Sequence, residues 1–402
     1  MDRSNNVWIG DYGNNRILVF FIPLVTDTVA DVVFGQNGSF TSNTCNLGGV
    51  SGNPTAKSLC NPDIMAFDGA GDLFATDESN CRVIKYNNPL GTTPPNTTAN
   101  QVFGQGGSFI SRGCNASGVT ATSLNLPDGI DFDGSGNFFI ADRQNNRVLE
   151  FKPPFAASPI PAVVFGQKGS FTSNSCNFGS SPSIAAANSL CVPDGIAADT
   201  NGNLWINDQS NNRVLRFTPP FPASSPGPSA NLVMGQLNFA DNAPNSVDST
   251  SYDFPSGVAI DRSAPTNRLY VADTRNNRVL GYINAVTFFN GGPASLVIGQ
   301  VDFGGAAANQ GVSPGANTLN GPTGVAVNAA TGDLFVADTG NSRVLRFAAP
   351  FSSGKVANQS ANAVFGQGGN FTAISCLTPT ATSMCNPAGV ALDSVGNLYV
   401  AD

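Results

Sequence analysis

The sequence of 402 residues contains no histidine, and this absence removes a large share of enzyme chemistry. Histidine is the commonest general base in active sites and the commonest zinc ligand in proteins. Ser-His-Asp triads, Cys-His pairs and histidine-bound metals are therefore excluded. Paired carboxylates could still exchange protons with a substrate, but no pair stands out from the surrounding pattern. The sequence thus predicts no catalytic residue, no metal site and no cofactor, and a protein that is not an enzyme.

Charge is also scarce, and basic charge most of all. Only 11% of the residues are charged, the formal net charge is −8, and no run is rich in Lys and Arg. Binding to a nucleic-acid backbone needs a basic footprint, and attraction to an anionic membrane needs a polybasic segment. No stretch of about 18 apolar residues could span a bilayer. These features exclude nucleic acid as a partner and exclude membrane insertion.

One motif recurs along the whole chain: a strand-like run that ends in Asp, a polar turn, and then Arg-Val-Leu or a close variant. The Asp residues of these copies are Asp11, Asp77, Asp142, Asp208, Asp273, Asp338 and Asp402. Successive copies lie 64 to 66 residues apart, and a fixed period of this size is typical of a repeat architecture. We therefore expect residues 1–402 to form one domain of about six repeats, or a segment of a longer array.

The third complete repeat shows what each unit contains. Its apolar runs are Pro193–Asp199, Leu204–Asp208, Arg213–Phe217 and Ala230–Gly235, with tight turns at Thr200–Asn203 and Gln209–Asn212. Four short runs separated by turns predict a four-stranded antiparallel meander. The runs are apolar at successive positions, which indicates sheets covered on both faces. Four-stranded sheets stacked in this way are the blades of a β-propeller, so the predicted fold class is all-β.

The repeats resemble NHL repeats. The resemblance is carried by Gly389-Val-Ala-Leu-Asp393, by Gly396-Asn-Leu-Tyr-Val-Ala-Asp402 and by Thr339-Gly-Asn-Ser-Arg-Val-Leu345. It covers nearly the whole chain, which is similar to NHL-repeat β-propellers of the secreted bacterial type, and it implies six blades of four antiparallel strands. Some NHL-like propellers are lyases that use histidine-bound zinc, and others bind RNA through a basic face. The missing histidine and the acidic balance exclude both activities here.

The two ends of the chain raise a question of closure. The chain starts on a second strand, Val7–Gly10, and stops after the same strand, Leu398–Ala401. Six blades could close if Gly389–Asp393 joined the three N-terminal strands, but one second strand would then be surplus. Either one end is displaced, or the chain is a window cut from a longer array. The first five residues are polar and predict no signal peptide, so a secreted chain would have lost its leader or would be a fragment.

A Gly-Gln pair ends the fourth strand of every repeat and begins a long polar loop. The glutamines are Gln36, Gln105, Gln167, Gln236, Gln300 and Gln367. By strand direction these loops lie on the same face as the Asn-Asn turns that follow the repeated Asp. Six such loops should roof that face, which is the predicted surface for a protein or glycan ligand.

The eight cysteines follow the repeat register. Cys45 and Cys60, Cys176 and Cys191, and Cys376 and Cys385 lie in the same loop, and the second member always stands two residues before a proline. This spacing predicts a recurring loop disulfide and an oxidising, extracellular setting. Cys81 replaces an Asn of one turn, and Cys114 lies nearby in the same blade, so we expect a Cys81–Cys114 bridge. The alternative for these cysteines is free thiols.

The repeated Asp and Arg residues allow two interpretations. The arginines are Arg16, Arg82, Arg147, Arg213, Arg278 and Arg343. They could form a ring of charge that captures an anionic ligand, or each Arg could pair with the Asp that closes its hairpin turn. Packing must repeat in every blade, whereas a binding function rarely does, so the structural interpretation is favoured.

Two further motifs have simple structural alternatives. Asp131–Asn137 has oxygen ligands at alternate positions, like part of a calcium loop, but every other repeat has a hairpin turn there. Five Asn-x-Ser/Thr motifs are candidate N-glycosylation sites, although an Asn-rich chain would contain several by chance. They are Asn37, Asn96, Asn115, Asn358 and Asn370.

These observations predict a secreted, disulfide-stapled β-propeller that binds a protein or a glycan and has no catalytic role. One alternative is a structural subunit of an extracellular fibre or longer array, which would bind copies of itself. A second alternative is a histidine-free lyase or hydrolase acting on a sugar. A deep pocket at the channel mouth, lined by carboxylates that the other blades lack, would support this second alternative, and a plugged channel would count against it.

Overall fold

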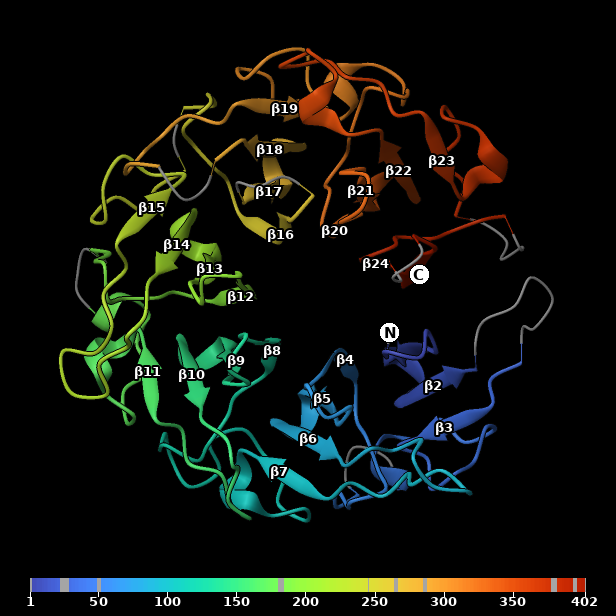
Figure 1. Cartoon of the computed structure of the whole chain (residues 1–402), viewed down its shortest axis with the longest axis vertical. Helices are drawn as coiled ribbons and strands as arrows, with labels where there is room; N and C mark the ends of the chain where they lie inside the picture. The colour runs from blue at the N-terminus through green and yellow to red at the C-terminus, as the bar shows by residue number, and fades with distance from the viewer. Residues whose placement is uncertain are drawn as a thin grey trace. The chain divides into compact units, whose positions relative to one another are not determined.

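The computed structural model describes residues 2–21, 29–48, 52–179, 184–244, 246–263, 267–284, 288–376, 382–392 and 396–401. Within these ranges it contains β-strands and short 3-10 turns and no α-helix (Figure 1). The chain divides into two compact units. Unit 1 comprises Met1–Leu204 and Phe217–Ser229, and unit 2 comprises Trp205–Arg216 and Ala230–Asp402. Asp393 and Asp402, which belong to the predicted repeat motifs, lie outside the described residues.

Unit 1 contains the first three repeats and the first strand of the fourth. The three-stranded sheet of the first repeat has β1 (Val7–Asp11), β2 (Arg16–Phe20) and β3 (Val32–Phe34). The second repeat has β4 (Pro62–Phe67), β5 (Leu73–Asp77), β6 (Arg82–Tyr86) and β7 (Gln101–Phe103). The third has β8 (Pro127–Phe132), β9 (Phe138–Asp142), β10 (Arg147–Phe151) and β11 (Val163–Phe165), and β12 spans Pro193–Ala198. In both four-stranded sheets the strands follow one another in chain order.

Unit 2 continues the same pattern. The fourth repeat supplies β13 (Leu204–Asp208), β14 (Arg213–Phe217) and β15 (Leu232–Met234). The fifth has β16 (Pro255–Asp261), β17 (Arg268–Asp273), β18 (Arg278–Tyr282) and β19 (Leu296–Ile298). The sixth has β20 (Val325–Val327), β21 (Leu334–Asp338), β22 (Arg343–Phe347) and β23 (Ala363–Phe365), and it is followed by the pair β24 (Gly389–Leu392) and β25 (Leu398–Ala401).

The second and third strands of each repeat are joined by a short 3-10 turn. These turns are η1 (Tyr12–Asn14), η3 (Glu78–Asn80), η5 (Arg143–Asn145), η8 (Gln209–Asn211), η9 (Thr274–Asn276) and η11 (Thr339–Asn341). The residue after each turn is left-handed, for example Asn146 at φ 53°. Asn tolerates this conformation better than most residues, which explains the Asn-Asn pattern.

The remaining 3-10 turns lie in the loops. They are η2 (Cys45–Leu47), η4 (Gln105–Gly107), η6 (Gln167–Gly169), η7 (Cys176–Gly179), η10 (Ala308–Gly311), η12 (Pro350–Ser352) and η13 (Gln367–Gly369). Three of them, η4, η6 and η13, begin at the glutamine of the Gly-Gln pair. Three of the six long loops therefore start with a 3-10 turn.

The hydrophobic core lies between the sheets of consecutive repeats. In unit 1, Trp8 and Phe34 of the first repeat pack with Leu73 and Ile84 of the second. In unit 2, the fifth and sixth repeats share a cluster that includes Val279. All residues of β5, β9 and β21 are buried, so both faces of these strands are covered, as the unbroken apolar runs predict.

The first strands of consecutive repeats also lie side by side. In unit 1, β8 contacts β4 and β12, and β4 also contacts β1, the second strand of the first repeat. A glycine in the first strand permits this approach, because a Cβ on Gly129 of β8 would lie 2.5 Å from the carbonyl oxygen of Asp194 in β12. The same approach in unit 2 brings β16 to β20 and β20 to β24.

The predicted fold class, an all-β six-bladed β-propeller of four-stranded antiparallel blades, is confirmed by this architecture. Among the described residues, β1 is hydrogen-bonded to β2 alone and β24 to β25 alone. Closure of the six blades through Gly389–Asp393 stays one of the possibilities that the sequence left open. The prediction of one domain over residues 1–402 stays a prediction.

Candidate functional site at the loop ends of the sheets

Each sheet has two different ends, which we name by their connections. At the loop end lie the 3-10 turn after the second strand and the long loop after the Gly-Gln pair. At the turn end lie the tight turn between the first and second strands and the connection between the third and fourth strands. Most of the predicted site residues lie at the loop end.

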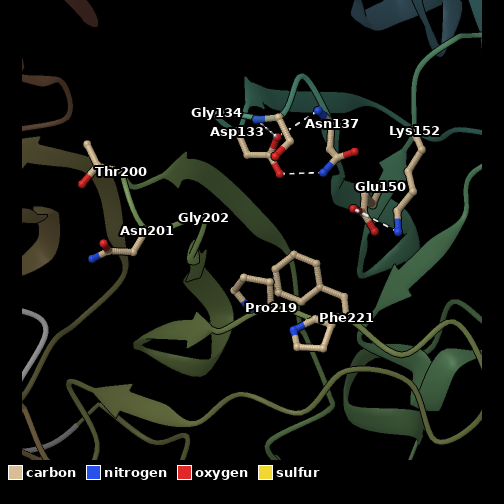
Figure 2. Close-up of a pocket in the computed structure, with 12 residues that line it drawn as sticks. Asp133, Gly134, Asn137, Glu150, Lys152, Thr200, Asn201, Gly202, Pro219 and Phe221 are labelled. Carbon is tan, nitrogen blue, oxygen red and sulfur yellow. Dashed lines mark hydrogen bonds and ion pairs between the residues drawn. The ribbon is translucent and has the colours of Figure 1, made fainter.

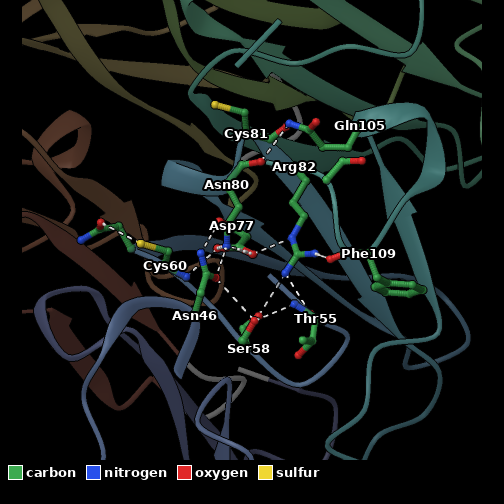
Figure 3. Close-up of polar contacts among 12 residues, drawn as sticks. Asn46, Thr55, Ser58, Cys60, Asp77, Asn80, Cys81, Arg82, Gln105 and Phe109 are labelled. Atoms are coloured by element: carbon green, nitrogen blue, oxygen red, sulfur yellow. Dashed lines mark hydrogen bonds and ion pairs between the residues drawn. The ribbon is translucent and has the colours of Figure 1, made fainter. Parts of the chain in front are cut away.

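The repeated Asp and Arg form buried ion pairs that fasten the long loops. In the second repeat, Arg82 Nε donates to Asp77 Oδ2 over 2.7 Å, and both side chains are fully buried (Figure 3). The remaining guanidinium nitrogens donate to the carbonyl oxygens of Phe109, Thr55 and Ser58. One arginine thus holds the loop before its own repeat and the loop after it.

The same ion pair recurs in all six repeats with 2.6–2.7 Å between Nε and Oδ2. In five repeats the side chains are fully buried, and only Arg16 and Asp11 are partly exposed, at 18% and 20%. A ligand cannot reach five of these guanidinium groups. The burial fits the structural interpretation of the motif and not a ring that captures anions.

The glutamines of the Gly-Gln pairs also hold the loops from inside. Gln167 Nε2 donates to the carbonyl oxygens of Asn146 and Ser175, each over 2.9 Å. Corresponding bonds to the turn and to the loop are made by the other five glutamines, Gln36, Gln105, Gln236, Gln300 and Gln367. These amides are used within the protein, so any ligand contact from the loops must come from other residues.

All eight cysteines form disulfides, in the four pairs that their register predicts. The pairs are Cys45–Cys60, Cys81–Cys114, Cys176–Cys191 and Cys376–Cys385. In the third repeat, Asn146 at the left-handed turn position donates to the carbonyl oxygen of Asn174 and accepts from the amide of Val192. Cys81 occupies this position in the second repeat at φ 52°, so a covalent link to the loop stands in place of these hydrogen bonds.

The five candidate glycosylation sites differ in accessibility. Asn37, Asn358 and Asn370 are exposed, and Asn96 is half-buried. Asn115 is half-buried, and its Nδ2, the atom that would carry a glycan, donates to Asn145 Oδ1 over 2.7 Å. The Asp131–Asn137 segment forms a hairpin turn in which Asp133 accepts from the amides of Ser135 and Asn137.

A group of ionisable side chains at the loop end of unit 1 was not singled out by the sequence. We call it the carboxylate cluster. Three members are the second residues of the first strands β4, β8 and β12, and the other three are the first residues of turns η1, η3 and η5. They are Asp63, Asp128, Asp194, Tyr12, Glu78 and Arg143. The close approach of neighbouring first strands brings them together.

The contacts within the cluster shift several pKa values. Burial and the neighbouring Asp128, whose carboxyl is hydrogen-bonded to that of Asp194, raise the pKa of Asp194 to about 8. Burial and the charges of Asp128 and Glu78 raise the pKa of Asp63 to about 6. Arg143 is the only cation in the cluster and lies 3.7 Å from Asp128 between Nε and Oδ2. Two carboxyl groups therefore change protonation close to neutral pH.

Glu78 and Tyr12 form the outer part of the cluster. Tyr12 Oη donates to Glu78 Oε2 over 2.9 Å. Burial and this carboxylate raise the pKa of Tyr12 to about 12. Burial also raises the pKa of Glu78. Among the described residues, no three His, Cys, Asp or Glu side chains are placed to hold a metal ion, so the cluster offers proton transfer and hydrogen bonding.

In unit 2, hydroxyl side chains occupy the corresponding positions, which are the second residue of the Pro-x pair before or at the first strand and the first residue of the 3-10 turn. Ser256 bonds with Thr274 over 2.6 Å, and Thr323 bonds with Thr339 over 2.7 Å. The signal in the sequence is therefore a difference between repeats: Pro-Asp begins the first strand in three repeats, and Pro-Ser, Pro-Thr or Pro-Ala begins it in the other three. The Pro-Asp pair by itself looks like part of a strand, and only its variation between repeats indicates a site.

The long loops also carry exposed apolar side chains. Those of unit 1 are Phe40, Leu47, Ile110 and Ile184, and those of unit 2 are Leu237, Val301, Val312 and Ile374. Ile110 is 69% exposed and Leu237 is 65% exposed. Both lie in loops that are fastened by a buried arginine and that start with a glutamine, which is half-buried for Gln105 and buried for Gln236.

Comparison with known proteins supports the β-propeller assignment. Residues 319–347 match the family model of the NHL repeat. A streptogramin B lyase structure is similar over 99% of this chain and 87% of its own chain, with a TM-score of 0.51 and 12% identity. A functionally unknown protein from Desulfotomaculum acetoxidans DSM 771 is similar over 99% and 89%, with a TM-score of 0.51 and 13% identity. None of the curated proteins compared with the chain matches it.

The predicted NHL resemblance is thus confirmed: the chain has a β-propeller fold and contains an NHL repeat. At 12–13% identity the two solved structures share the fold alone with this protein. The four disulfides fit an oxidising compartment. Among the described residues, no helix is long and apolar enough to cross a membrane.

Proposed function

We propose that this chain is a secreted, non-catalytic binding protein that recognises a protein partner through the loop ends of its sheets. The observation that carries the proposal is the set of exposed apolar side chains on loops that are held from within. Exposed apolar groups on a fixed surface are typical of protein-binding sites. A surface that is already ordered loses little conformational entropy on binding.

The loops are fixed in three ways. A buried arginine donates to their carbonyl groups, a glutamine amide bonds to their first turn, and a disulfide closes the loop in the first, third and sixth repeats. A loop that only connects two sheets would not need so many stabilising contacts. It supports a role in which the loop surface must keep one shape.

Electrostatics suggests the character of the partner. The net charge is −8, and the carboxylate cluster places Asp63 and Glu78 at the loop end of unit 1 with a single arginine among them. A partner with apolar and basic groups would complement this surface. A glycan would instead need polar and aromatic groups, and the exposed loop side chains are mostly aliphatic.

The test compares loop-end variants with a turn-end control. A partner would be isolated from proteins secreted by the source cells, and its affinity would be measured for Ile110→Ser, for Leu237→Ser and for Ile160→Ser. Ile160 is 68% exposed but lies between β10 and β11 at the turn end. We expect weaker binding, by roughly tenfold, from at least one loop-end variant and no change from the control. Equal affinities for all three variants would refute the proposal.

The carboxylate cluster favours a second candidate, a histidine-free hydrolase or lyase acting on a sugar. Asp128 and Asp194 are hydrogen-bonded to each other, and Asp63 has a pKa of about 6, so an acid and a base are both available near neutral pH. The test is a panel of chromogenic glycosides and uronic acid polymers assayed between about pH 5 and pH 9. Turnover that Asp194→Asn abolishes would support this candidate, and turnover that survives it would not.

A further inference from the structure

Unit 1 has a pocket at the turn end, on the opposite side of the sheets from the carboxylate cluster. Its volume is about 460 Å³, within the usual range for small-molecule sites. It lies between the β8–β9 turn, the end of β10, the β12–β13 turn and the segment after β14. Figure 2 shows Glu150 and Lys152 on one side of the space and Pro219 and Phe221 on another.

Glu150 is the unusual residue of this pocket. Its side chain is 1% exposed, yet its nearest cation is Lys152, with 3.9 Å between Oε1 and Nζ. Its other carboxylate oxygen, Oε2, is buried and has no hydrogen-bond partner among the described residues. Lys152 is 53% exposed. A buried carboxylate oxygen without a partner is costly, which indicates a group that is completed by something outside the chain.

The second repeat shows what normally completes this position. There the corresponding residue of the third strand is Lys85, whose Nζ lies 2.7 Å from Asp72 Oδ2. The same Nζ lies over the rings of Phe74 and Phe155, 5.4 and 5.7 Å from their centroids. An ammonium group is thus held between a carboxylate and two aromatic faces, which is a favourable setting for a cation.

The third repeat has the same surroundings but the opposite charge. Glu150 stands opposite Phe139 in the strand pair, as Lys85 stands opposite Phe74. Phe221 lies 6.3 Å from Phe139 between ring centroids and corresponds to Phe155, which follows β10 and packs on Phe74 of the second repeat. The aromatic faces are kept, a second carboxylate from Asp133 lines the pocket, and Glu150 replaces the cation of the third strand, which leaves the largely exposed Lys152 as the cation among the lining residues.

Other repeats supply their own cation at this position. Arg346 of the sixth repeat donates to Asp333 Oδ2 from Nη2 and Nε. Arg216 of the fourth lies 5.7 Å from the centroid of the Trp205 ring. In the fifth repeat, where the position is Gly281, Arg268 from the neighbouring strand lies over Phe351 at 5.1 Å. The third repeat is the one in which a cation is replaced by a carboxylate.

We propose that this pocket binds a small organic cation, an ammonium or guanidinium group on a short aliphatic chain, which occupies the place that Lys85 fills in the second repeat. Glu150 would accept hydrogen bonds from the charged group, and Phe221 would cover the aliphatic chain. The site is separate from the loop ends, so the proposal does not depend on the function proposed above.

The test is isothermal titration calorimetry with agmatine and n-butylamine, and with butan-1-ol as an uncharged ligand of similar shape. We expect both amines to bind at low salt and the alcohol not to bind. Glu150→Gln should weaken amine binding by roughly 30-fold or more, because it removes the charge that pairs with the ligand. Glu150→Lys should abolish binding, because it restores the residue of the second repeat, and its melting temperature should not fall.

The control is Asp31→Asn, which removes the same charge from an exposed residue elsewhere at the turn end. It should bind the amines as the wild type does. The proposal would be overturned if the alcohol bound as tightly as n-butylamine, if no heat appeared with either amine at about millimolar concentration, or if Glu150→Gln bound both amines with unchanged affinity. The melting temperature of each variant separates a loss of binding from a loss of folding.

Discussion

The carboxylate cluster makes an unusual prediction about pH: the protein should become more stable as the pH falls from about 9 to about 5. The pKa of Asp194 rises from 3.8 to about 8 in the folded protein, and that of Asp63 rises from 3.8 to about 6. A carboxyl group with a raised folded pKa favours folding while it is protonated. Its contribution is complete below the unfolded pKa and is lost as the pH rises through the folded value.

The size of the effect can be worked from Asp194. A shift from 3.8 to about 8 corresponds to at most ~6 kcal/mol, at ~1.4 kcal/mol per unit. Asp194 is only half-buried and is hydrogen-bonded to Asp128, so solvent screening and coupling reduce this to on the order of 3 kcal/mol. With ~2.1 cal/mol/K per residue, a chain of 402 residues would melt about 4 °C lower at pH 9 than at pH 5.

The assay is differential scanning calorimetry at constant ionic strength, with Asp194→Asn beside the wild type. The variant cannot ionise at this position, so it should be the more stable protein at high pH and should lose much of the slope. Some slope should remain, because burial also raises the pKa of Glu150 in the turn-end pocket. A melting temperature that falls between pH 8 and pH 6, or a variant with the wild-type slope, would refute the reasoning.

Three further predictions concern the framework of the loops. Arg147→Ala should cost about 3–5 kcal/mol in denaturant unfolding, because it leaves Asp142 buried without its cation, whereas Arg16→Ala, at a partly exposed pair, should cost about 1 kcal/mol or less. Cys81→Asn combined with Cys114→Ser should be more stable, by calorimetry, than Cys81→Ala with the same partner change, since Asn suits the left-handed turn position. In a glycosylating host, peptide mass spectrometry should find Asn115 unmodified, because its Nδ2 is already bonded within the protein.

The fold could be predicted because its signals are local and repeated. Asp marks the end of the second strand, and Arg marks the start of the third. The final Asn of the turn predicts a residue in the left-handed conformation, such as Asn212. The register of the loops was enough to place Cys81 near Cys114 as well. Each of these signals recurs in several repeats, so the copies support one another.

The candidate sites could not be predicted in the same way, because they depend on contacts between repeats. In the sequence, Asp63 and Asp194 look like the second residue of any first strand. Their raised pKa values arise because neighbouring strands lie close together, so that each carboxyl group is buried near other carboxyl groups. In the sequence, Glu150 looks like an ordinary charged residue at the surface. Only the structure shows that its side chain is buried beside aromatic rings and that one of its carboxylate oxygens has no hydrogen-bond partner among the described residues. The burial of the glutamine amides was also not evident, since a polar residue at the start of a loop usually faces solvent.

The residues that recur in all repeats are those whose polar groups are used in hydrogen bonds within the protein. The buried Asp–Arg pair, the glutamine amide and the turn asparagine have their hydrogen-bonding groups occupied by the protein itself, so they have little left to offer a ligand. Where one repeat has a different residue from the other repeats at the same position, that residue does not make the shared structural contact. Its neighbours still resemble those that surround the usual side chain in the other repeats. We infer that specificity in this protein lies at such departures: Asp194 where unit 2 has hydroxyl groups, and Glu150 where the second repeat has Lys85. A swap of Glu150 for the lysine of the second repeat tests this inference directly, because it should abolish amine binding while leaving the melting temperature nearly unchanged.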